Sequence, residues 1–296
     1  MRYAQRLVIG WFRARLNLTA VFSPSLAARH AMEIFSTPFR RQRKEMPGIF
    51  WKSEALGFNF DGRHLQAYRW NHPAERKVLI LHGYESCAYK FERYVKPLIR
   101  KGFTVVAIDA PAHGRSEGRR VTLMDYVRAI EQTEKRYGPF DAYMAHSFGG
   151  IAASLFLEGR ADKKDARLSL IAPATETSTA LAHFYRFLQI GEPVRREFEK
   201  IIERRTGHDV AHYSIRRMAG NIRARMLWVH DEDDQVTPIS DVRPVMEAGH
   251  PHIRFMVTNG LGHRRIYRDD RVARAVVDFL SGDEPGESTE DSDGFA

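Results

Sequence analysis

Short, continuous apolar runs alternate with helical patterns through the middle of the chain. Runs of this length, bounded by Gly or polar residues, predict strands that are buried on both faces. Between two of them, residues 122–137 place apolar side chains at helical spacing and end at Gly138-Pro139, a helix stop signal. The alternation indicates right-handed crossovers and a mostly parallel sheet covered by helices. The runs lie at residues 78–81, 103–108, 141–144, 168–171, 226–229 and 253–257.

The run at residues 141–144 leads directly into a serine that is flanked by small residues, in the sequence Ala145-His146-Ser147-Phe148-Gly149-Gly150. A nucleophilic serine at the tip of a sharp strand-to-helix turn holds unfavourable backbone angles, and it needs small side chains two positions before and after it. Ala145 and Gly149 meet that requirement, although glycine is the usual residue at the first position. The segment therefore predicts an exposed nucleophile.

Over residues 51–280 the chain resembles the α/β-hydrolase family. The motifs that carry the resemblance are His82-Gly83 after an early strand, the Asp-x-Pro-x-x-Gly-x-Ser loop at 109–116, the turn at Ser147, and a late Gly-x-Gly-His ending at residue 263. The resemblance implies an α/β fold with a mostly parallel, doubly wound sheet of about eight strands. It also implies helices on both faces and a small helical cap inserted at about 175–222.

The resemblance further implies a catalytic serine, acid and histidine in that chain order. We take Ser147 as the nucleophile and His263, on a glycine-containing loop after a strand, as the general base. Residues 230–238 offer four carboxylates, and the family spacing to Pro238 selects Asp234 as the acid. Asp231 is the less favoured alternative, because it would lie at the end of the strand.

These residues predict a serine hydrolase that cleaves a carboxylic ester through an acyl-enzyme. The resemblance assigns the oxyanion hole to the backbone N–H groups of Tyr84 and Phe148. No metal and no organic cofactor is expected. A thioesterase, an amidase or an acyltransferase would use the same triad, and a non-catalytic scaffold that keeps the fold is the alternative from another class.

The stretch from Pro173 to Met226 is too long for a simple crossover, and its helical patterns predict the cap. Its apolar side chains can line a pocket for a hydrophobic acyl group, as in a monoacylglycerol or a lysophospholipid; alternatively, they pack the cap onto the sheet. His82 and His146 flank the expected site, where structural hydrogen bonding is the favoured interpretation. The candidate pocket residues are His82, His146, Leu181, Phe184 and Phe187.

A competing metal site is conceivable at His208 and His212, four residues apart. The intervening acidic residue is Asp209 rather than glutamate, and no third ligand follows at a sensible spacing. We therefore expect no metal there.

The two ends of the chain differ in charge. Residues 1–45 hold nine basic and two acidic residues, whereas residues 281–296 hold six acidic residues and no basic one. We expect residues 1–50 to form a helical, basic amphipathic extension. It would lie across the domain, form a dimer contact or bind an anionic membrane surface. The acidic tail is expected to be disordered. No recognition motif supports nucleic-acid binding, despite the net charge of +9.

The single cysteine, Cys87, excludes an internal disulfide framework and favours a reducing compartment. No run of eighteen apolar residues is present, and the interrupted N-terminal pattern does not match a signal peptide. We therefore expect a cytoplasmic enzyme, with membrane association through residues 1–45 as the alternative. The sequence leaves the oligomeric state open.

Overall fold

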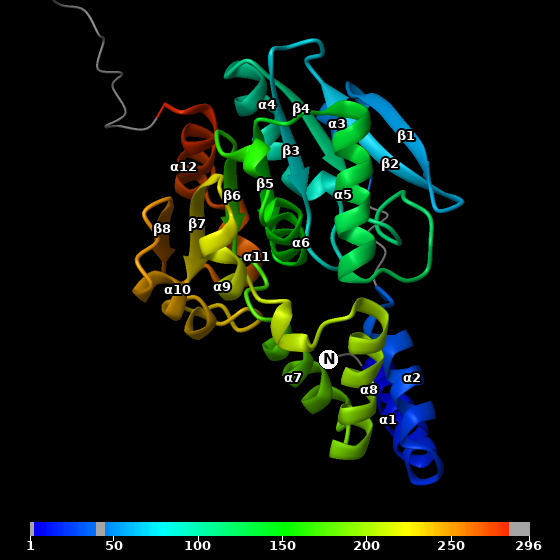
Figure 1. Ribbon diagram of the computed structural model, residues 1–296. Coiled ribbons are helices and arrows are strands. Elements are labelled where there is room, and N and C mark those ends of the chain that lie inside the picture. The colour runs from blue at the N-terminus through cyan, green and yellow to red at the C-terminus, as the bar shows by residue number, and fades with distance from the viewer. Residues whose placement is uncertain (1–2, 40–44, 284–296) are drawn as a thin grey trace, which may run out of the picture.

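A computed structural model describes residues 3–39 and 45–283 of the chain. Most of the predicted acidic tail lies outside these residues. The described part contains a sheet of eight strands in the order β1-β2-β4-β3-β5-β6-β7-β8 (Figure 1). β1 pairs with β2 and β2 with β4 in antiparallel fashion, and the other pairs are parallel. The strands are β1 (Glu54–Phe60), β2 (Arg63–Trp70), β3 (Arg76–Leu81), β4 (Phe103–Ile108), β5 (Ala142–His146), β6 (Arg167–Ile171), β7 (Arg225–Asp231) and β8 (Ile253–Thr258).

The predicted mostly parallel sheet of about eight strands is confirmed. Every residue of β4 and of β5 is buried, as expected for central strands that are covered on both faces. β1 and β2 were not among the apolar runs, because antiparallel strands near an edge alternate buried and exposed positions. An alternation of period two is a weaker sequence signal for a strand than a continuous run of Val, Ile and Leu.

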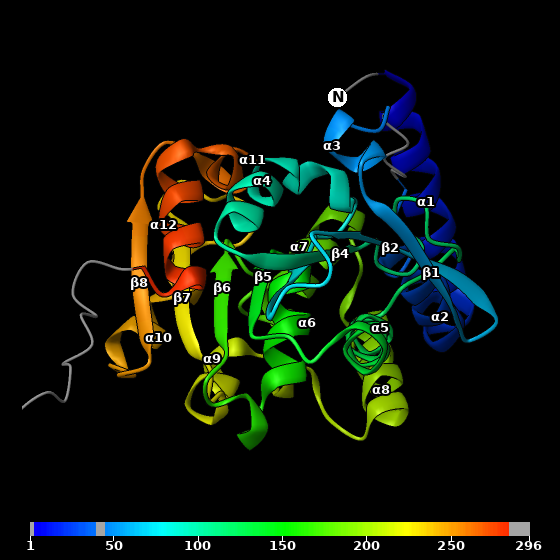
Figure 2. The same ribbon diagram turned by 90° about the horizontal axis from the view of Figure 1, so that it is seen from above.

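Helices cover both faces of the sheet (Figure 2). α4 and α12 pack on one face, and α5 and α6 pack on the other. α5 begins at a capping box, in which Thr122 and Asp125 each satisfy the other's backbone N–H. The bounds are α3 (Gly48–Trp51), η1 (Ala88–Phe91), α4 (Glu92–Arg100), α5 (Leu123–Tyr137), α6 (Phe148–Leu157), η2 (Ala161–Lys163), η5 (Ile239–Asp241), α10 (Arg243–Glu247), α11 (Gly262–Arg265), η6 (Ile266–Arg268) and α12 (Asp270–Ser281).

Four helices from two distant parts of the chain form a bundle beside the sheet domain (Figure 1). They are α1 (Tyr3–Phe22) and α2 (Pro24–Phe35) from the N-terminus, and α7 (Thr177–Leu188) and α8 (Glu192–Thr206) from the segment between β6 and β7. The same segment continues through η3 (Val210–His212), α9 (Ile215–Met218) and η4 (Ala219–Asn221). The N-terminal helices and the predicted cap helices therefore share one apolar core, and we call this assembly the helix bundle.

Phe198 lies at the centre of this core. Its side chain is fully buried, and its ring lies within 6.0 Å, centroid to centroid, of three other aromatic rings. Those rings belong to Phe35 of α2 and to Phe184 and Tyr185 of α7. A single side chain thus joins three of the four helices.

The helix bundle is tied to the sheet domain by hydrogen bonds at the end of α2. The Tyr84 hydroxyl donates to the carbonyl of Phe35 at 2.9 Å, and the Val121 N–H donates to the carbonyl of Ser36 at 2.8 Å. The Phe39 N–H donates to the carboxylate of Glu85 at 3.1 Å. Two of these three contacts reach the loop that follows β3.

Replacing Phe198 by alanine should lower the free energy of unfolding by about 3 kcal/mol, because it leaves a cavity among three rings. Urea unfolding followed by circular dichroism measures this loss. Phe22→Ala is the matched control, since the Phe22 side chain is exposed and its removal should change stability by less than about 0.5 kcal/mol. Equal effects of the two variants would contradict the described packing of the bundle.

Candidate active site

Ser147 stands at the junction of β5 and α6, in the backbone conformation expected of a strained turn. Its φ is 53° and its ψ is −117°. Residues other than glycine rarely occupy this region of backbone angles. The turn is also crowded by backbone. A Cβ on Gly149 would lie 2.7 Å from the carbonyl oxygen of His82, and a Cβ on Gly83 would lie 2.9 Å from the Cβ of Ser147. Glycine is therefore required at both positions for the two loops to meet.

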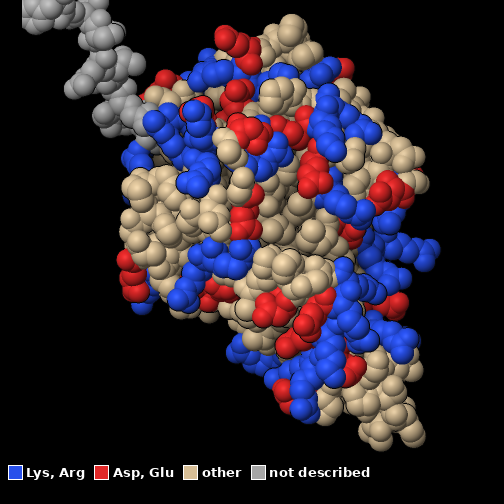
Figure 3. All heavy atoms as spheres, in the orientation of Figure 1, with Lys and Arg blue, Asp and Glu red and all other residues tan. Residues whose placement is uncertain are grey.

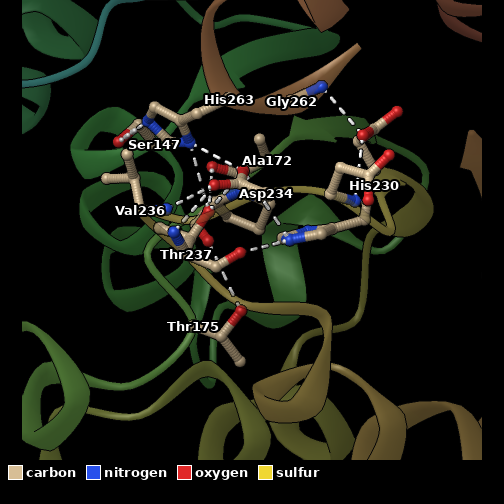
Figure 4. Close-up of polar contacts among 12 residues, drawn as sticks. Ser147, Ala172, Thr175, His230, Asp234, Val236, Thr237, Gly262 and His263 are labelled. Atoms are coloured by element: carbon tan, nitrogen blue, oxygen red, sulfur yellow. Dashed lines mark hydrogen bonds and ion pairs between the residues drawn. The ribbon is translucent and has the colours of Figure 1, made fainter. Parts of the chain in front are cut away.

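Ser147, His263 and Asp234 form one hydrogen-bonded chain (Figure 4). The Ser147 hydroxyl lies 3.0 Å from Nε2 of His263, and Nδ1 of His263 lies 2.8 Å from Oδ2 of Asp234. The structure thus brings together the three residues that the sequence analysis proposed as a triad. This arrangement lets the imidazole accept the serine proton while the carboxylate fixes its tautomer.

The carboxylate of Asp234 is buried and accepts several hydrogen bonds besides that of His263. Burial acts to raise the pKa of Asp234, but the hydrogen bond and charge of His263 and two backbone N–H donors outweigh it, so the pKa is lowered. The donors are Val236 N at 2.8 Å and Thr237 N at 2.9 Å. Asp234 therefore remains ionised beside the imidazole.

The alternative acid, Asp231, has a different set of partners. Its carboxylate accepts hydrogen bonds from the backbone N–H of Leu261 at 3.0 Å and of Gly262 at 2.8 Å. The Thr258 hydroxyl donates to it at 2.7 Å. Asp231 thus anchors the loop that carries His263, whereas Asp234 contacts the imidazole itself.

Thr237 is a site residue that the sequence analysis missed. Its hydroxyl donates to Oδ2 of Asp234 at 2.9 Å, the same oxygen that His263 contacts (Figure 4). Its carbonyl in turn accepts a hydrogen bond from Nε2 of the buried His230 at 2.7 Å. The signal was present in the sequence, because a threonine three residues after an aspartate commonly closes a local side-chain turn.

The two proposed oxyanion residues lie close to each other next to Ser147. Phe148 follows the serine in the chain, and the close approach of Gly83 to Ser147 brings Tyr84 near; the two rings are 5.7 Å apart. Within residues 3–39 and 45–283, no hydrogen bond is made by the backbone N–H of Tyr84 or of Phe148. Both donors are therefore available to an oxygen that binds next to Ser147.

His82 and His146 are buried next to the site and are held by structural hydrogen bonds. Nε2 of His82 accepts from the Ala110 N–H at 2.9 Å, and its Nδ1 donates to the carbonyl of Gly83 at 2.7 Å. His146 contacts the carbonyl of His263 at 3.1 Å. Burial lowers the pKa of His82 to about 4 and that of His146 to about 3. Both rings are therefore neutral at pH 7, in line with the favoured structural interpretation.

The candidate pocket residues of the cap are used in packing. Leu181 is buried in the core of the helix bundle, and Phe184 packs against the same core. Phe187 is exposed at the end of α7, where the guanidinium of Arg13 lies 5.9 Å from its ring. Leu181 and Phe184 thus pack inside the helix bundle, not onto the sheet as the packing alternative expected, whereas Phe187 is exposed.

The rings of His208 and His212 stack with their centroids 3.7 Å apart. Among the residues that the structure describes, no group of three or more His, Cys, Asp or Glu side chains is arranged to hold a metal ion. None of the described helices has the length and apolar character needed to cross a bilayer.

Solved structures share this architecture. An esterase of Pyrococcus furiosus (Pf2001) matches with a TM-score of 0.62 and 18% identity, over 83% of this chain and 96% of that chain. The chain has the α/β-hydrolase fold. A monoacylglycerol lipase of Paleococcus ferrophilus matches this chain with a TM-score of 0.57 and 21% identity, over 74% of this chain and 99% of the other. A membrane phospholipase A, described as a bacterial virulence factor, matches with a TM-score of 0.60 and 15% identity, over 94% and 98% of the two chains.

Sequence comparison agrees with this assignment. The family model described as "Serine aminopeptidase, S33" (Hydrolase_4) matches residues 72–208. The uncharacterized hydrolase YugF of Bacillus subtilis (strain 168) is 29% identical over 69 residues, which is 23% of this chain. That match spans only 25% of the length of YugF. Both sequence matches are to hydrolases.

The burial of His82 predicts a pH dependence of stability. In the folded protein its pKa is lowered to about 4, whereas an unfolded histidine titrates near 6.5. As the pH falls from about 6.5 to about 4, His82 therefore binds a proton in the unfolded state but not in the folded state, and the free energy of unfolding decreases. The slope from this one group should approach ~1.4 kcal/mol per pH unit.

Urea unfolding of the wild type and of His82→Gln at several pH values between 7 and 4 measures this slope. The glutamine amide keeps an acceptor but does not titrate, so the variant should show a shallower decline. If the two proteins lose stability in parallel over this range, the assignment to His82 is wrong.

Proposed function

We propose that this α/β hydrolase is a serine hydrolase that cleaves the carboxylic ester of a hydrophobic acyl group. The observation that carries the proposal is the continuous hydrogen-bonded chain from Ser147 through His263 to Asp234. It begins at a serine whose backbone is held in a strained turn at the end of β5. A structural serine would not need all of these features together.

In the proposed reaction, the Ser147 hydroxyl gives its proton to Nε2 of His263 as its oxygen attacks the ester carbonyl carbon. The resulting imidazolium is stabilised by the ionised Asp234. His263 then donates the proton to the departing alcohol, which leaves an acyl-Ser147 ester. A water molecule, deprotonated by His263, hydrolyses this ester and releases the carboxylic acid.

The tetrahedral intermediate of each step carries a negative oxygen. The N–H groups of Tyr84 and Phe148 are proposed to receive it, because both are free to donate and lie on residues that flank Ser147. Tyr84 is also joined to Phe35 of α2 through its hydroxyl. The helix bundle therefore helps to fix one half of the proposed oxyanion hole.

A hydrophobic acyl group is favoured by the apolar surface around Ser147. The Tyr84 and Phe148 rings contact each other beside the serine, and Val236, next to the Asp234 loop, has an exposed side chain. The names of the similar solved structures, an esterase, a monoacylglycerol lipase and a membrane phospholipase A, point in the same direction. A monoacylglycerol or a lysophospholipid is the substrate class that we propose, in a reducing compartment suited to the single, buried Cys87.

The same triad would serve a thioesterase, an amidase or an acyltransferase, and a panel of p-nitrophenyl esters, acyl thioesters and anilides separates these activities. The alternative from another class is a scaffold protein that keeps the fold without catalysis. A folded protein that turns over none of these substrates would favour the scaffold.

Removing members of the triad should affect the hydrolysis of p-nitrophenyl esters, tested from acetyl to palmitoyl, to different extents. Ser147→Ala and His263→Ala should reduce kcat by roughly 10⁵-fold or more. Asp234→Asn should remain measurably active, with a kcat roughly 10³- to 10⁴-fold below that of the wild type. Ser53→Ala, which alters a serine outside the site, is the control and should behave as the wild type. Full activity in Ser147→Ala would refute the proposed nucleophile.

Thr237 is proposed as a positioning residue that acts through Asp234. Thr237→Val removes the hydroxyl and keeps the shape, so kcat should fall by about tenfold while KM stays nearly constant. Thr237→Ser restores the hydroxyl and should recover most of the rate. Equal rates in the valine and serine variants would show that the hydroxyl does not position the acid.

A further inference from the structure

The corner between α1 and α2 carries a group of apolar side chains without a partner. Val21 and Phe22 are 79% and 83% exposed, the highest values for large apolar side chains among the residues described. Leu18, on the preceding turn of α1, is 65% exposed, and Leu26, on the first turn of α2, is 41% exposed. We call Leu18, Val21, Phe22 and Leu26 the apolar tip.

The apolar tip is held on a firmly packed support. Leu16, Ala27 and Ala28, which alternate with the tip residues along the two helices, are buried in the core of the helix bundle. The corner itself is tight, because Ser23 is the only residue between the helices and its hydroxyl caps α2 by accepting from the Leu26 N–H. The exposure of the tip is therefore built into the fold and does not come from a frayed helix.

The tip lies at the end of the helix bundle that is farthest from the sheet. Figure 1 shows the α1–α2 corner projecting there, and Figure 3 shows surface without charged residues at the same narrow end, with Lys and Arg side chains gathered behind it. A convex projection of this kind offers no groove or flat face to a protein partner, whose specific interfaces need roughly 800 Å² from each side. The convex shape of the apolar tip instead suits a partner that can deform around the tip.

The two helices that carry the tip have only basic charged side chains near it. Residues 1–32 contain no Asp or Glu at all, and Arg13, Arg15 and Arg29 lie on the two helices that carry the tip. Arg13 also donates to the carbonyl of Phe187, at the adjacent end of α7, with Nε at 3.0 Å. An apolar projection with basic side chains behind it matches the layering of a membrane interface, where acyl chains lie beneath anionic headgroups.

We propose that the apolar tip inserts into the interface of an anionic lipid bilayer and docks the enzyme on its surface. Phe22 and Val21 enter the boundary between headgroups and acyl chains, and the arginines of α1 and α2 contact lipid phosphates. α2 runs from this tip to Phe35, which accepts the hydrogen bond of the Tyr84 hydroxyl, so one rigid helix links the docking point to the loop beside Ser147. The proposal goes beyond the hydrolase activity and does not require it.

Co-sedimentation with vesicles tests the proposal on the full chain in a Ser147→Ala background, so that no lipid is consumed. The protein should pellet with vesicles of 70% phosphatidylcholine and 30% phosphatidylglycerol, and binding should weaken in phosphatidylcholine alone or at high salt. Adding Val21→Ser and Phe22→Ser should lower the partition coefficient by about tenfold or more. The matched control is Trp51→Ser, which removes a side chain that is 68% exposed on α3, outside the bundle.

Circular dichroism establishes that the double variant is folded, and light scattering after gel filtration reports the mass of each protein in solution. Loss of vesicle binding in the tip variant with retention in Trp51→Ser supports the proposal. The proposal would be overturned if the Ser147→Ala protein with an unaltered tip did not bind the vesicles, or if the tip variant bound them equally well. A change from dimer to monomer in the tip variant without a change in vesicle binding would also overturn it, because the tip would then be a contact between copies of the chain.

Discussion

The close approach of two backbone segments at Ser147 is the constraint on which the rest of the site depends. The loop after β3 and the turn after β5 meet so tightly that neither Gly83 nor Gly149 has room for a Cβ. This contact holds the serine in its strained conformation, and it also brings Tyr84 and Phe148 close to each other next to the nucleophile. The parallel pairing of β3 with β5 makes the contact possible, because the two strands end at the same edge of the sheet.

Two carboxylates at the end of β7 have different tasks that their hydrogen bonds explain. Asp231 binds backbone N–H groups of the loop that carries His263, and Asp234 binds the imidazole of His263. The first fixes where the histidine loop lies, and the second fixes how the ring is oriented. Thr237 completes the second arrangement by donating to the oxygen of Asp234 that faces the ring. Such supporting contacts set the geometry of the groups that would react.

Much of this could be predicted from the sequence, because buried parallel strands and a strained turn at a serine leave strong local patterns. The central strands, the sheet class and Ser147 were predicted in this way, and Asp234 and His263 were assigned with the help of the resemblance to the α/β-hydrolase family. β1, at the edge of the sheet, and its neighbour β2 were not predicted, since antiparallel strands near an edge leave a weaker pattern. Leu181 and Phe184 could not be placed either, because their partners on α2 are more than a hundred residues away in the chain.

The central claim is that Ser147 is a nucleophile activated by its neighbours. Reaction with a fluorophosphonate, followed by tandem mass spectrometry of the digested protein, tests this claim most directly, because the reagent bonds to activated serines without regard to the natural acyl group. The account predicts a single phosphonyl adduct on the peptide that contains Ser147, and no adduct when His263 is replaced by alanine. An unlabelled folded protein, or an adduct on another serine, would contradict it.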